Sequence, residues 1–321
     1  MAGQGAGVAN EPGMSAAHDL TVAQQAPQAA TKRLEDGRAG RAPAVDGFWR
    51  RFRRSRSGMT GLVIVAAFAL AALFAPWLAL RDPVEGDIVA SLQPPSADAP
   101  FGTDALGRDI FSRVVYGARL SLLVSLASVA LGIVVAVPMG LAAGYAGGKM
   151  DTVVRSLADL LLAFPPFLLA LSLVAVIGVG LQNVIISVGI TTMPMYIRLV
   201  RAEVMRVKQR DYVTAAYALG QRPVAIIVRH ILPNVASLVL VQSTLYMGVA
   251  LLYSAGLGFL GLGVQPPTPE WGAMLGSGRD YIYSAPHLTL FPGLAIFLSV
   301  LGFNLLGDGL RDTLDPQLKG R

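Results

Sequence analysis

The sequence predicts an all-α integral membrane protein with six transmembrane helices. Of its 321 residues, 54% are hydrophobic and only 14% are charged, whereas a soluble domain usually carries about 25% charged residues. Most of the six apolar runs reach the ~20 residues that a helix needs to cross a bilayer. They lie at 60–80, 120–145, 157–178, 184–200, 231–262 and 288–306.

The distribution of basic residues predicts how these spans are oriented. With a cytoplasmic N-terminus, the cytoplasmic segments hold 21 of the 26 Lys and Arg residues. The positive-inside rule therefore places the N- and C-termini in the cytoplasm. Because the same distribution accounts for the net charge of +6, the basic character requires no nucleic-acid partner.

Three segments are expected before the main body of the protein. Residues 1–47 are rich in Ala, Gly and Gln and have no apolar period, which predicts a disordered cytoplasmic tail. Residues 48–80 combine the basic stretch "FWRRFRRSRS" with the first transmembrane helix. That stretch suits either contact with an anionic leaflet or a positive stop that fixes orientation. Residues 81–118 form an acidic, Pro-containing extracytoplasmic loop.

Residues 119–309 are expected to hold the other five spans. A cytoplasmic loop at 201–230 lies between spans four and five, and residues 310–321 form the cytoplasmic C-terminus. Ionisable residues are scarce within the spans, which argues against a proton-driven carrier. Arg155 and Asp159 lie four residues apart in span three and are expected to neutralise each other on one helix face.

Glycines and prolines predict the packing and the breaks of these spans. Gly140, Gly144 and Gly148 recur every four residues, so they would share one helix face that lets another helix approach closely. The pair Pro165-Pro166 in span three and Pro194 in span four predict kinked or broken helices.

Motifs of catalysis and nucleotide binding are lacking or misplaced. "GLGFLG" at 256–261 fits a dinucleotide fingerprint, but it closes an apolar helical run instead of following a strand. No phosphate-binding G-x-x-x-x-G-K-[ST] motif is present. The histidines at 18, 230 and 287 are too dispersed for a metal cluster or a catalytic triad, and there is no Cys. We therefore expect no enzyme activity, no cofactor and no metal in this chain.

The predicted cytoplasmic loop contains a short helix with clear ends. In "DYVTAAYALGQRP", Asp211 is expected to cap the start, Gly220 suits the stop, and Pro223 bars continuation. The helix would have about two to three turns. Ala215 and Ala216 leave a face of small side chains that another protein can approach closely.

The spacing of this loop resembles a known family. Ala215-Ala216-x-x-x-Gly220, nine residues, then His230-x-Leu232-Pro233 is similar to the cytoplasmic "EAA" loop of permease subunits in binding-protein-dependent ABC importers. Thr214 stands where the loop is named for Glu, and His230 stands where Ile is usual. A salt bridge carried by that Glu is therefore not expected here.

Three further segments resemble the dipeptide, oligopeptide and nickel branch of these permeases and its C-type subunit. They are "PFGTDALGRDIFSRVVYGARLSL" at 100–122, "GLGFLGLGVQPPTPEWGAML" at 256–275 and "LGDGLRDTLDP" at 306–316. The resemblance runs from about residue 48 to 316. It implies a type I ABC importer permease fold in the cytoplasmic (inner) membrane of a prokaryote.

The resemblance also implies partners and coupling residues. A second, homologous permease subunit would share the bilayer, two ATP-binding subunits would bind ATP and magnesium beneath it, and an extracytoplasmic solute-binding protein would deliver the cargo. The short loop helix would dock in a cleft of an ATPase. The implied coupling residues are Asp211, Thr214, Ala215, Ala216, Gly220, His230, Leu232 and Pro233.

Several alternatives remain open at this point. The cargo is expected to be di- or oligopeptides, with nickel or another small solute as the alternative within the family. An ion-coupled secondary carrier would work alone, and a membrane enzyme or scaffold lacks a catalytic constellation. The coupling loop has a plain connector as its alternative. The outer segments 100–116 and 266–287 either contact the binding protein or cover the spans.

Overall fold

The computed structural model describes residues 44–314, with side chains from residue 48 onward. The chain divides into two units, 1–51 and 52–321, which are described separately. Most of the predicted disordered tail, 1–47, lies outside the described residues. Residues 44–47 differ from that prediction, because they belong to helix α2 (Ala44–Arg54), which carries the basic stretch.

Within the described residues of the second unit, all regular structure is helical apart from one isolated bridge between Thr103 and Asp109. Five continuous helices are long and apolar enough to cross a membrane. They are α3 (Arg56–Leu73), α5 (Ile110–Ala146), α8 (Leu181–Lys208), the helix Pro223–Phe259 and α13 (His287–Leu314). Pro223–Phe259 comprises α10 (Pro223–Ile226), the π-helical turn η2 (Ile227–Ile231) and α11 (Leu232–Phe259).

The sixth predicted span is a bent pair of helices. α6 (Gly148–Leu162) and α7 (Pro166–Ile177) meet at 88°. The break confirms the prediction from Pro165-Pro166, and Pro166 begins α7, where a missing N–H costs least. With 12 residues, α7 extends roughly 18 Å, less than the ~30 Å hydrocarbon core, so neither the bend nor α7 alone makes a regular span.

Pro194 predicted a kinked or broken helix, and of these two outcomes the break is absent, because α8 continues through Pro194 from Leu181 to Lys208. Pro138 is likewise accommodated inside α5. Neighbouring helices and local hydroxyl groups compensate for backbone groups that proline leaves free.

Close packing of α5 against α8 forms the centre of the bundle. A Cβ on Gly140 would lie 2.8 Å from the Cβ of Val200, and one on Gly144 would lie 2.7 Å from that of Val204. These two glycines confirm the predicted close-packing face. Gly148 does not belong to it: α5 ends at Ala146, and Gly148 begins α6 with φ +55° and nothing within 4 Å of its Cβ position.

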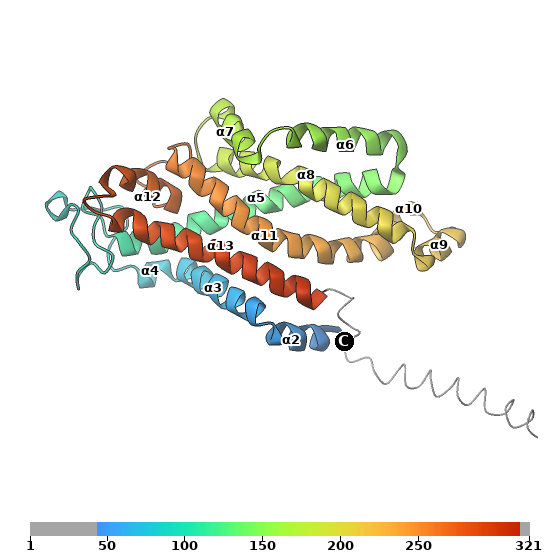
Figure 1. Ribbon diagram of the computed structural model, residues 1–321, viewed down its shortest axis with the longest axis horizontal. Helices are drawn as coiled ribbons and strands as arrows, with labels where there is room; N and C mark the ends of the chain where they lie inside the picture. Colours follow the sequence, from blue (N-terminus) through green and yellow to red (C-terminus); the bar gives the residue numbers. More distant parts are fainter. Residues whose placement is uncertain (1–43, 315–321) are drawn as a thin grey trace, which may run out of the picture. The chain divides into compact units, whose positions relative to one another are not determined.

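The two ends of the bundle differ in structure. Figure 1 places α9 (Asp211–Ala218) and the turn from α5 to α6 at one end, and α12 (Trp271–Gly278) with the loop before α5 at the other. That loop ends at Asp109, which caps α5, so residues 110–118 are helical and not part of the predicted loop. The short helices α4 (Ala75–Leu78), η1 (Ile88–Ala90) and η3 (Arg279–Tyr281) also lie in the connections.

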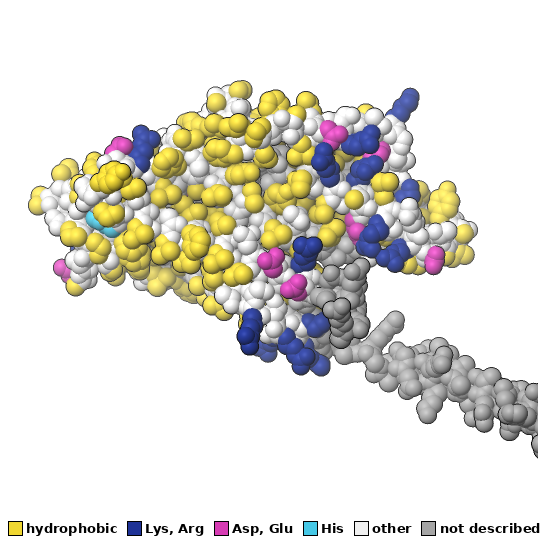
Figure 2. All heavy atoms as spheres, viewed as in Figure 1, with side chains coloured by type: hydrophobic (Ala, Val, Ile, Leu, Met, Phe, Trp, Pro, Cys, Tyr) yellow, Lys and Arg dark blue, Asp and Glu magenta, His cyan; other side chains and the backbone are white. Residues whose placement is uncertain are grey.

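The connections at the end opposite α9 are held against the bundle by buried contacts. Trp271 of α12 is fully buried, and its indole Nε1 donates to the Val114 carbonyl at 2.9 Å. Arg113 of α5 donates to the Pro83 carbonyl at 2.6 Å. Figure 2 shows hydrophobic side chains over the middle of the bundle and Lys and Arg side chains grouped mainly towards the end that carries α9.

Candidate functional site

The predicted loop helix is present as α9, which has about two turns. Its start differs from the prediction, because Arg210 and not Asp211 occupies the cap position. Asp211 is the first helical residue, and its side chain makes no capping hydrogen bond. It lies in the first turn, where a carboxylate interacts favourably with the positive end of the helix dipole.

The end of α9 confirms the prediction from Gly220. Gly220 has φ +72°, a backbone conformation that L side chains rarely adopt. Its N–H donates to the Tyr217 carbonyl at 3.0 Å, and the Gln221 N–H donates to the Ala216 carbonyl at 3.2 Å. This pair of bonds is a Schellman motif. Pro223 then begins the next helix, as the sequence indicates.

The two faces of α9 have different environments. Val213 and Ala216 are buried, with 4% and 5% of their surface exposed, and both belong to the core cluster of the bundle. Thr214, Ala215 and Gly220 are exposed. The prediction of a small-residue face with both alanines free for a partner is therefore wrong for Ala216, because that side chain anchors α9 to its own bundle.

The remaining predicted residues lie where the chain returns to the membrane helix. His230 is the penultimate residue of the π-helical turn η2 and is half-buried, while Leu232 is half-buried and Pro233 is exposed at the start of α11. Asn234 donates to the His230 carbonyl at 2.7 Å and to the Tyr212 hydroxyl of α9 at 3.4 Å. This bridge joins α9 to the helix that follows it.

A cavity of about 580 Å³ lies beside α9. Its walls include Thr214 and Tyr217 of α9, Lys208 at the end of α8, and Tyr145 at the end of α5. The Lys208 ammonium donates to the Tyr145 carbonyl at 2.8 Å and lies 5.2 Å from the centre of the Tyr145 ring. The cavity thus lies between α9 and the ends of α5 and α8, which Lys208 and Tyr145 join to each other.

Two ion pairs connect α6 to α8. Arg201 pairs with Asp151 through two hydrogen bonds, one of them 2.7 Å between Nη2 and Oδ2, and Arg198 pairs with Asp159 at 2.6 Å. The expectation that Arg155 neutralises Asp159 is therefore wrong. The partner of Asp159 lies on another helix, which brings Arg198 within hydrogen-bonding distance.

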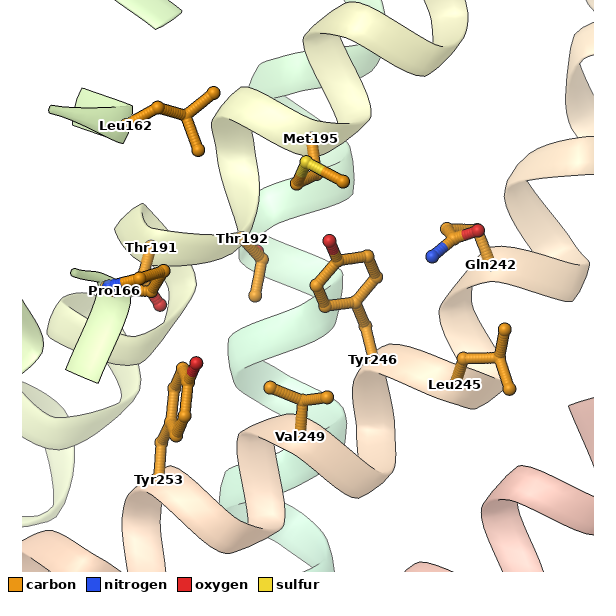
Figure 3. Close-up of a pocket in the computed structure, with 10 residues that line it drawn as sticks. All are labelled: Leu162, Pro166, Thr191, Thr192, Met195, Gln242, Leu245, Tyr246, Val249 and Tyr253. Atoms are coloured by element: carbon orange, nitrogen blue, oxygen red, sulfur yellow. The ribbon is translucent and has the colours of Figure 1, made fainter. Parts of the chain in front are cut away.

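A groove whose apolar lining is interrupted by several polar side chains lies between α8 and α11. Its first part has a volume of about 390 Å³ and is lined by Thr191, Thr192, Met195, Gln242, Tyr246 and Tyr253 together with four apolar residues. Figure 3 shows the Gln242 amide and the two tyrosine hydroxyls directed into the space between the helices. Tyr196 packs against the groove residue Tyr246, with the two ring centres 5.4 Å apart, and its hydroxyl lies 3.1 Å from that of Ser243.

A second cavity of about 430 Å³ adjoins the first and shares Gln242 and Leu245 with it. It continues along α11 towards Asn234 and therefore towards the end that carries α9. Glu203, Arg206 and Arg311 line this part. Arg206 donates to both carboxylate oxygens of Glu203, at 2.8 and 2.5 Å.

At the opposite end, most of segment 100–116 is buried. Arg108 and Arg113 lie 2.7 and 3.6 Å from the carboxylate of Asp104, and Asp109 is 1% exposed. These contacts favour the structural alternative for this segment, a cover over the spans. Segment 266–287 differs, because its tip exposes Tyr283 completely and half of Ile282.

Sequence reasoning did not predict the groove. Gln242 and Tyr246 lie within an apolar run, where Ser243 and Thr244 directly follow Gln242, and the spacing of four residues places Gln242 and Tyr246 on one face of a helix. This spacing could have been used to predict a polar stripe on that helix. The Glu203–Arg206 pair has the i, i+3 spacing of neighbours on a helix surface, but the sequence does not indicate that this pair lines a cavity.

Two family models match the chain. Residues 136–320 match the family described as binding-protein-dependent transport system inner membrane component. Residues 46–95 match the N-terminal TM domain of oligopeptide transport permease C.

Curated relatives are similar over most of their length. A dipeptide transport system permease protein of Alkalihalophilus pseudofirmus is 46% identical over 271 residues, which cover 84% of this chain and 89% of the relative. A di/tripeptide transport system permease protein of Pseudomonas aeruginosa is 47% identical, with 85% and 92% covered. A glutathione transport system permease protein of Escherichia coli is also 47% identical, with 85% and 90% covered.

The fold has a counterpart among solved structures. A chain of the MetNI methionine ABC transporter, in an inward-facing conformation, aligns with a TM-score of 0.52 and 22% identity. The alignment covers 64% of this chain and 98% of that one. This likeness supports the helical arrangement of the bundle.

Proposed function

The chain belongs to the family of binding-protein-dependent transport system inner membrane components, and from this premise we propose that it is one of two permease subunits in an ABC importer for short peptides. Members of this family are multi-pass permeases of the bacterial inner membrane and not enzymes. Together with a second permease, the chain would form the transport path. Separate subunits would bind ATP and magnesium, and a binding protein would deliver the peptide.

The observation that carries the coupling role is the position of α9. It protrudes at one end of the bundle (Figure 1), yet Val213 and Ala216 anchor it in the core. Its exposed side presents Thr214, Ala215 and Gly220. A helix that is rigidly attached to the bundle and open on its other side can transmit movement of an ATPase to the membrane helices.

The remaining predicted residues have supporting roles in this proposal. Asp211 sets the first turn of α9, and Ala216 holds it against the bundle. His230, Leu232 and Pro233 form the rigid return to α11 through η2. These five residues would preserve the geometry of the docking surface and would not touch the ATPase themselves.

Short peptides are the cargo that the relatives favour. Three relatives carry the names dipeptide, di/tripeptide and glutathione permease, and glutathione is itself a tripeptide. Nickel, the alternative within the branch, has no such support among them. An ion-coupled carrier would transport without ATPase subunits, so reconstitution separates it from the importer.

The test is ATP-dependent uptake of a labelled dipeptide into proteoliposomes that contain this chain, its partner permease and both ATPases. Wild type is compared with Gly220→Trp. The matched control is Gly261→Trp at the other end of α11. Gly261 also has positive φ (+78°) and nothing within 4 Å of its Cβ position, and its neighbours make the same Schellman hydrogen bonds.

We expect uptake to require every subunit. Gly220→Trp should abolish uptake and capture of the ATPases, because the indole occupies the docking surface, while Gly261→Trp retains ATPase capture. Equal ATPase capture by the two variants would refute the coupling role of α9. Uptake by this chain alone would refute the importer and favour the secondary carrier.

A further inference from the structure

The groove between α8 and α11 is continuous over much of the bundle. Its two cavities, of about 390 and 430 Å³, share Gln242 and Leu245. Together they follow one face of α11 from Tyr253 to Asn234. Cavities of a few hundred cubic ångströms are typical of sites for small ligands. The groove thus leads from the middle of the bundle to the end that carries α9.

Three polar side chains in the groove lack hydrogen-bond partners. Among the residues that the structure describes, no hydrogen bond joins the Gln242 amide, the Tyr246 hydroxyl or the Tyr253 hydroxyl to another group, although the hydroxyls of Thr191, Thr192, Ser243, Thr244 and Ser254 in the same two helices are paired. A polar group facing lipid without a partner costs several kcal/mol. These side chains are therefore expected to face water or a polar ligand and not lipid.

The charged end of the groove has a different character. Glu203 and Arg206 lie on α8, and Arg311 lies on α13 across the cavity. The Glu203 side chain is 9% exposed, whereas that of Arg206 is 57% exposed. The groove therefore passes from neutral hydrogen-bonding groups to a mouth that carries both signs of charge.

We propose that this groove is the contribution of the chain to the path of the transported peptide. This inference rests on the proposed function. An amide and two phenolic hydroxyls can hydrogen-bond to a peptide backbone whatever its side chains, because they donate and accept. The uncharged part of the groove can bind a peptide without forming an ion pair, so no strong charge interaction would keep the peptide there. The mixed charges of the mouth suit the ammonium and carboxylate groups of a short zwitterionic peptide.

The test uses single cysteines, because the chain has none of its own. Gln242→Cys and Val249→Cys place a thiol in the groove. The control is Leu240→Cys, on the same helix but about 160° around its axis from Gln242 at 3.6 residues per turn. The assembled transporter in detergent is treated with a charged methanethiosulfonate reagent, with and without a dipeptide, and modification of this chain is followed by mass spectrometry.

We expect the reagent to modify both groove thiols and to leave the thiol at position 240 unmodified. A dipeptide at about ten times its dissociation constant should slow modification at position 242 by about tenfold, in proportion to occupancy. Groove thiols as unreactive as the control would mean that lipid or the second permease fills the groove. Fast modification without protection by the peptide would mean that only water fills it, and either result overturns the inference.

Uptake by wild type is measured in the same preparation. If wild type shows no ATP-dependent uptake, the proposed function fails, whatever the cysteines report. If wild type transports and the cysteine pattern is absent, only the groove assignment fails. The two failures are therefore distinguishable.

Discussion

Gly140 of α5 lies directly against Val200 of α8, so that a Cβ on the glycine would come within 2.8 Å of the valine Cβ. The contact continues along both helices, because Gly144 meets Val204 and Gly132 meets Thr192 in the same way. Without side chains at these positions of α5, the two backbones approach closely along most of the bundle. In a membrane, where burial of apolar surface adds little, such packing is a main source of helix association.

Gly140→Ala should lower the apparent melting temperature of the purified protein in detergent. The added methyl group would also come within 3.0 Å of the Ile197 carbonyl oxygen. Overpacking of this kind typically costs about 1–3 kcal/mol, which corresponds to roughly 2–10 °C for a chain of this size. Tryptophan fluorescence during heating would report it.

The matched control is Gly248→Ala in α11. There a Cβ finds its nearest neighbours, in Val300, at 3.6 Å, an ordinary contact. Alanine is also the better helix former by about 1 kcal/mol, so the melting temperature should stay unchanged or rise. A similar loss of stability in both variants would contradict the packing argument.

Much of this architecture is predictable from the sequence because it depends on local pattern. Six apolar runs, a glycine every fourth residue, the double proline and the glycine after α9 each act within one turn or one helix. These signals predicted the all-helical fold, the close-packing face at Gly140 and Gly144, the break at Pro165-Pro166 and the end of α9 at Gly220.

Several of the misses share one physical cause, which is that contacts with other helices decide the outcome. Asp159 has Arg155 one turn away, yet it pairs with Arg198 of α8. Ala215 and Ala216 are the same residue type at adjacent positions, so the sequence does not distinguish them. Packing against the bundle decides that Ala216 faces the core.

The two alanines of α9 should respond differently to the same substitution. Ala215→Leu adds bulk on the exposed side, so the melting temperature should remain that of wild type while capture of the ATPase subunits weakens. Ala216→Leu forces a larger side chain into a site that is 5% exposed, which should cost about 1–3 kcal/mol. Melting curves and ATPase pull-down, measured on both variants, separate docking from stability. Loss of ATPase capture only in Ala216→Leu would argue against the exposed side as the docking surface.

The two ion pairs between α6 and α8 should differ in strength. The side chains of Arg201 and Asp151 are 22% and 19% exposed, whereas those of Arg198 and Asp159 are 52% and 50% exposed. Arg201→Gln should therefore lower the melting temperature more than Arg198→Gln does, because the Arg201–Asp151 pair is less exposed and is joined by two hydrogen bonds. Arg198→Gln, an exposed pair, should cost at most about 1 kcal/mol. Thermal melting in low salt tests this order, and a larger loss for Arg198→Gln would reverse it.

Glu270 should make stability depend on pH. Its carboxylate is 3% exposed and caps α12, with oxygens 2.9 Å from the Gly272 N–H and 2.8 Å from the Ala273 N–H. Burial raises the pKa of Glu270 above its ordinary value, and the hydrogen bonds from Gly272, Ala273 and Ser121 only partly oppose this shift. Glu270 therefore takes up its proton at a higher pH in the folded protein than in the unfolded chain.

The sign of the effect follows from that difference. A group whose pKa is raised by folding contributes stability that is fully present below its unfolded pKa, about 4.3 for Glu. That contribution is lost as the pH rises through the folded pKa. Glu270→Gln is neutral at every pH, so its melting temperature relative to wild type should increase as the pH is raised from about 4 to neutrality. Glu85→Gln removes the same charge from the exposed outer loop and serves as the control. A difference between Glu270→Gln and wild type that stays constant with pH, or decreases, would show that burial does not govern this carboxylate.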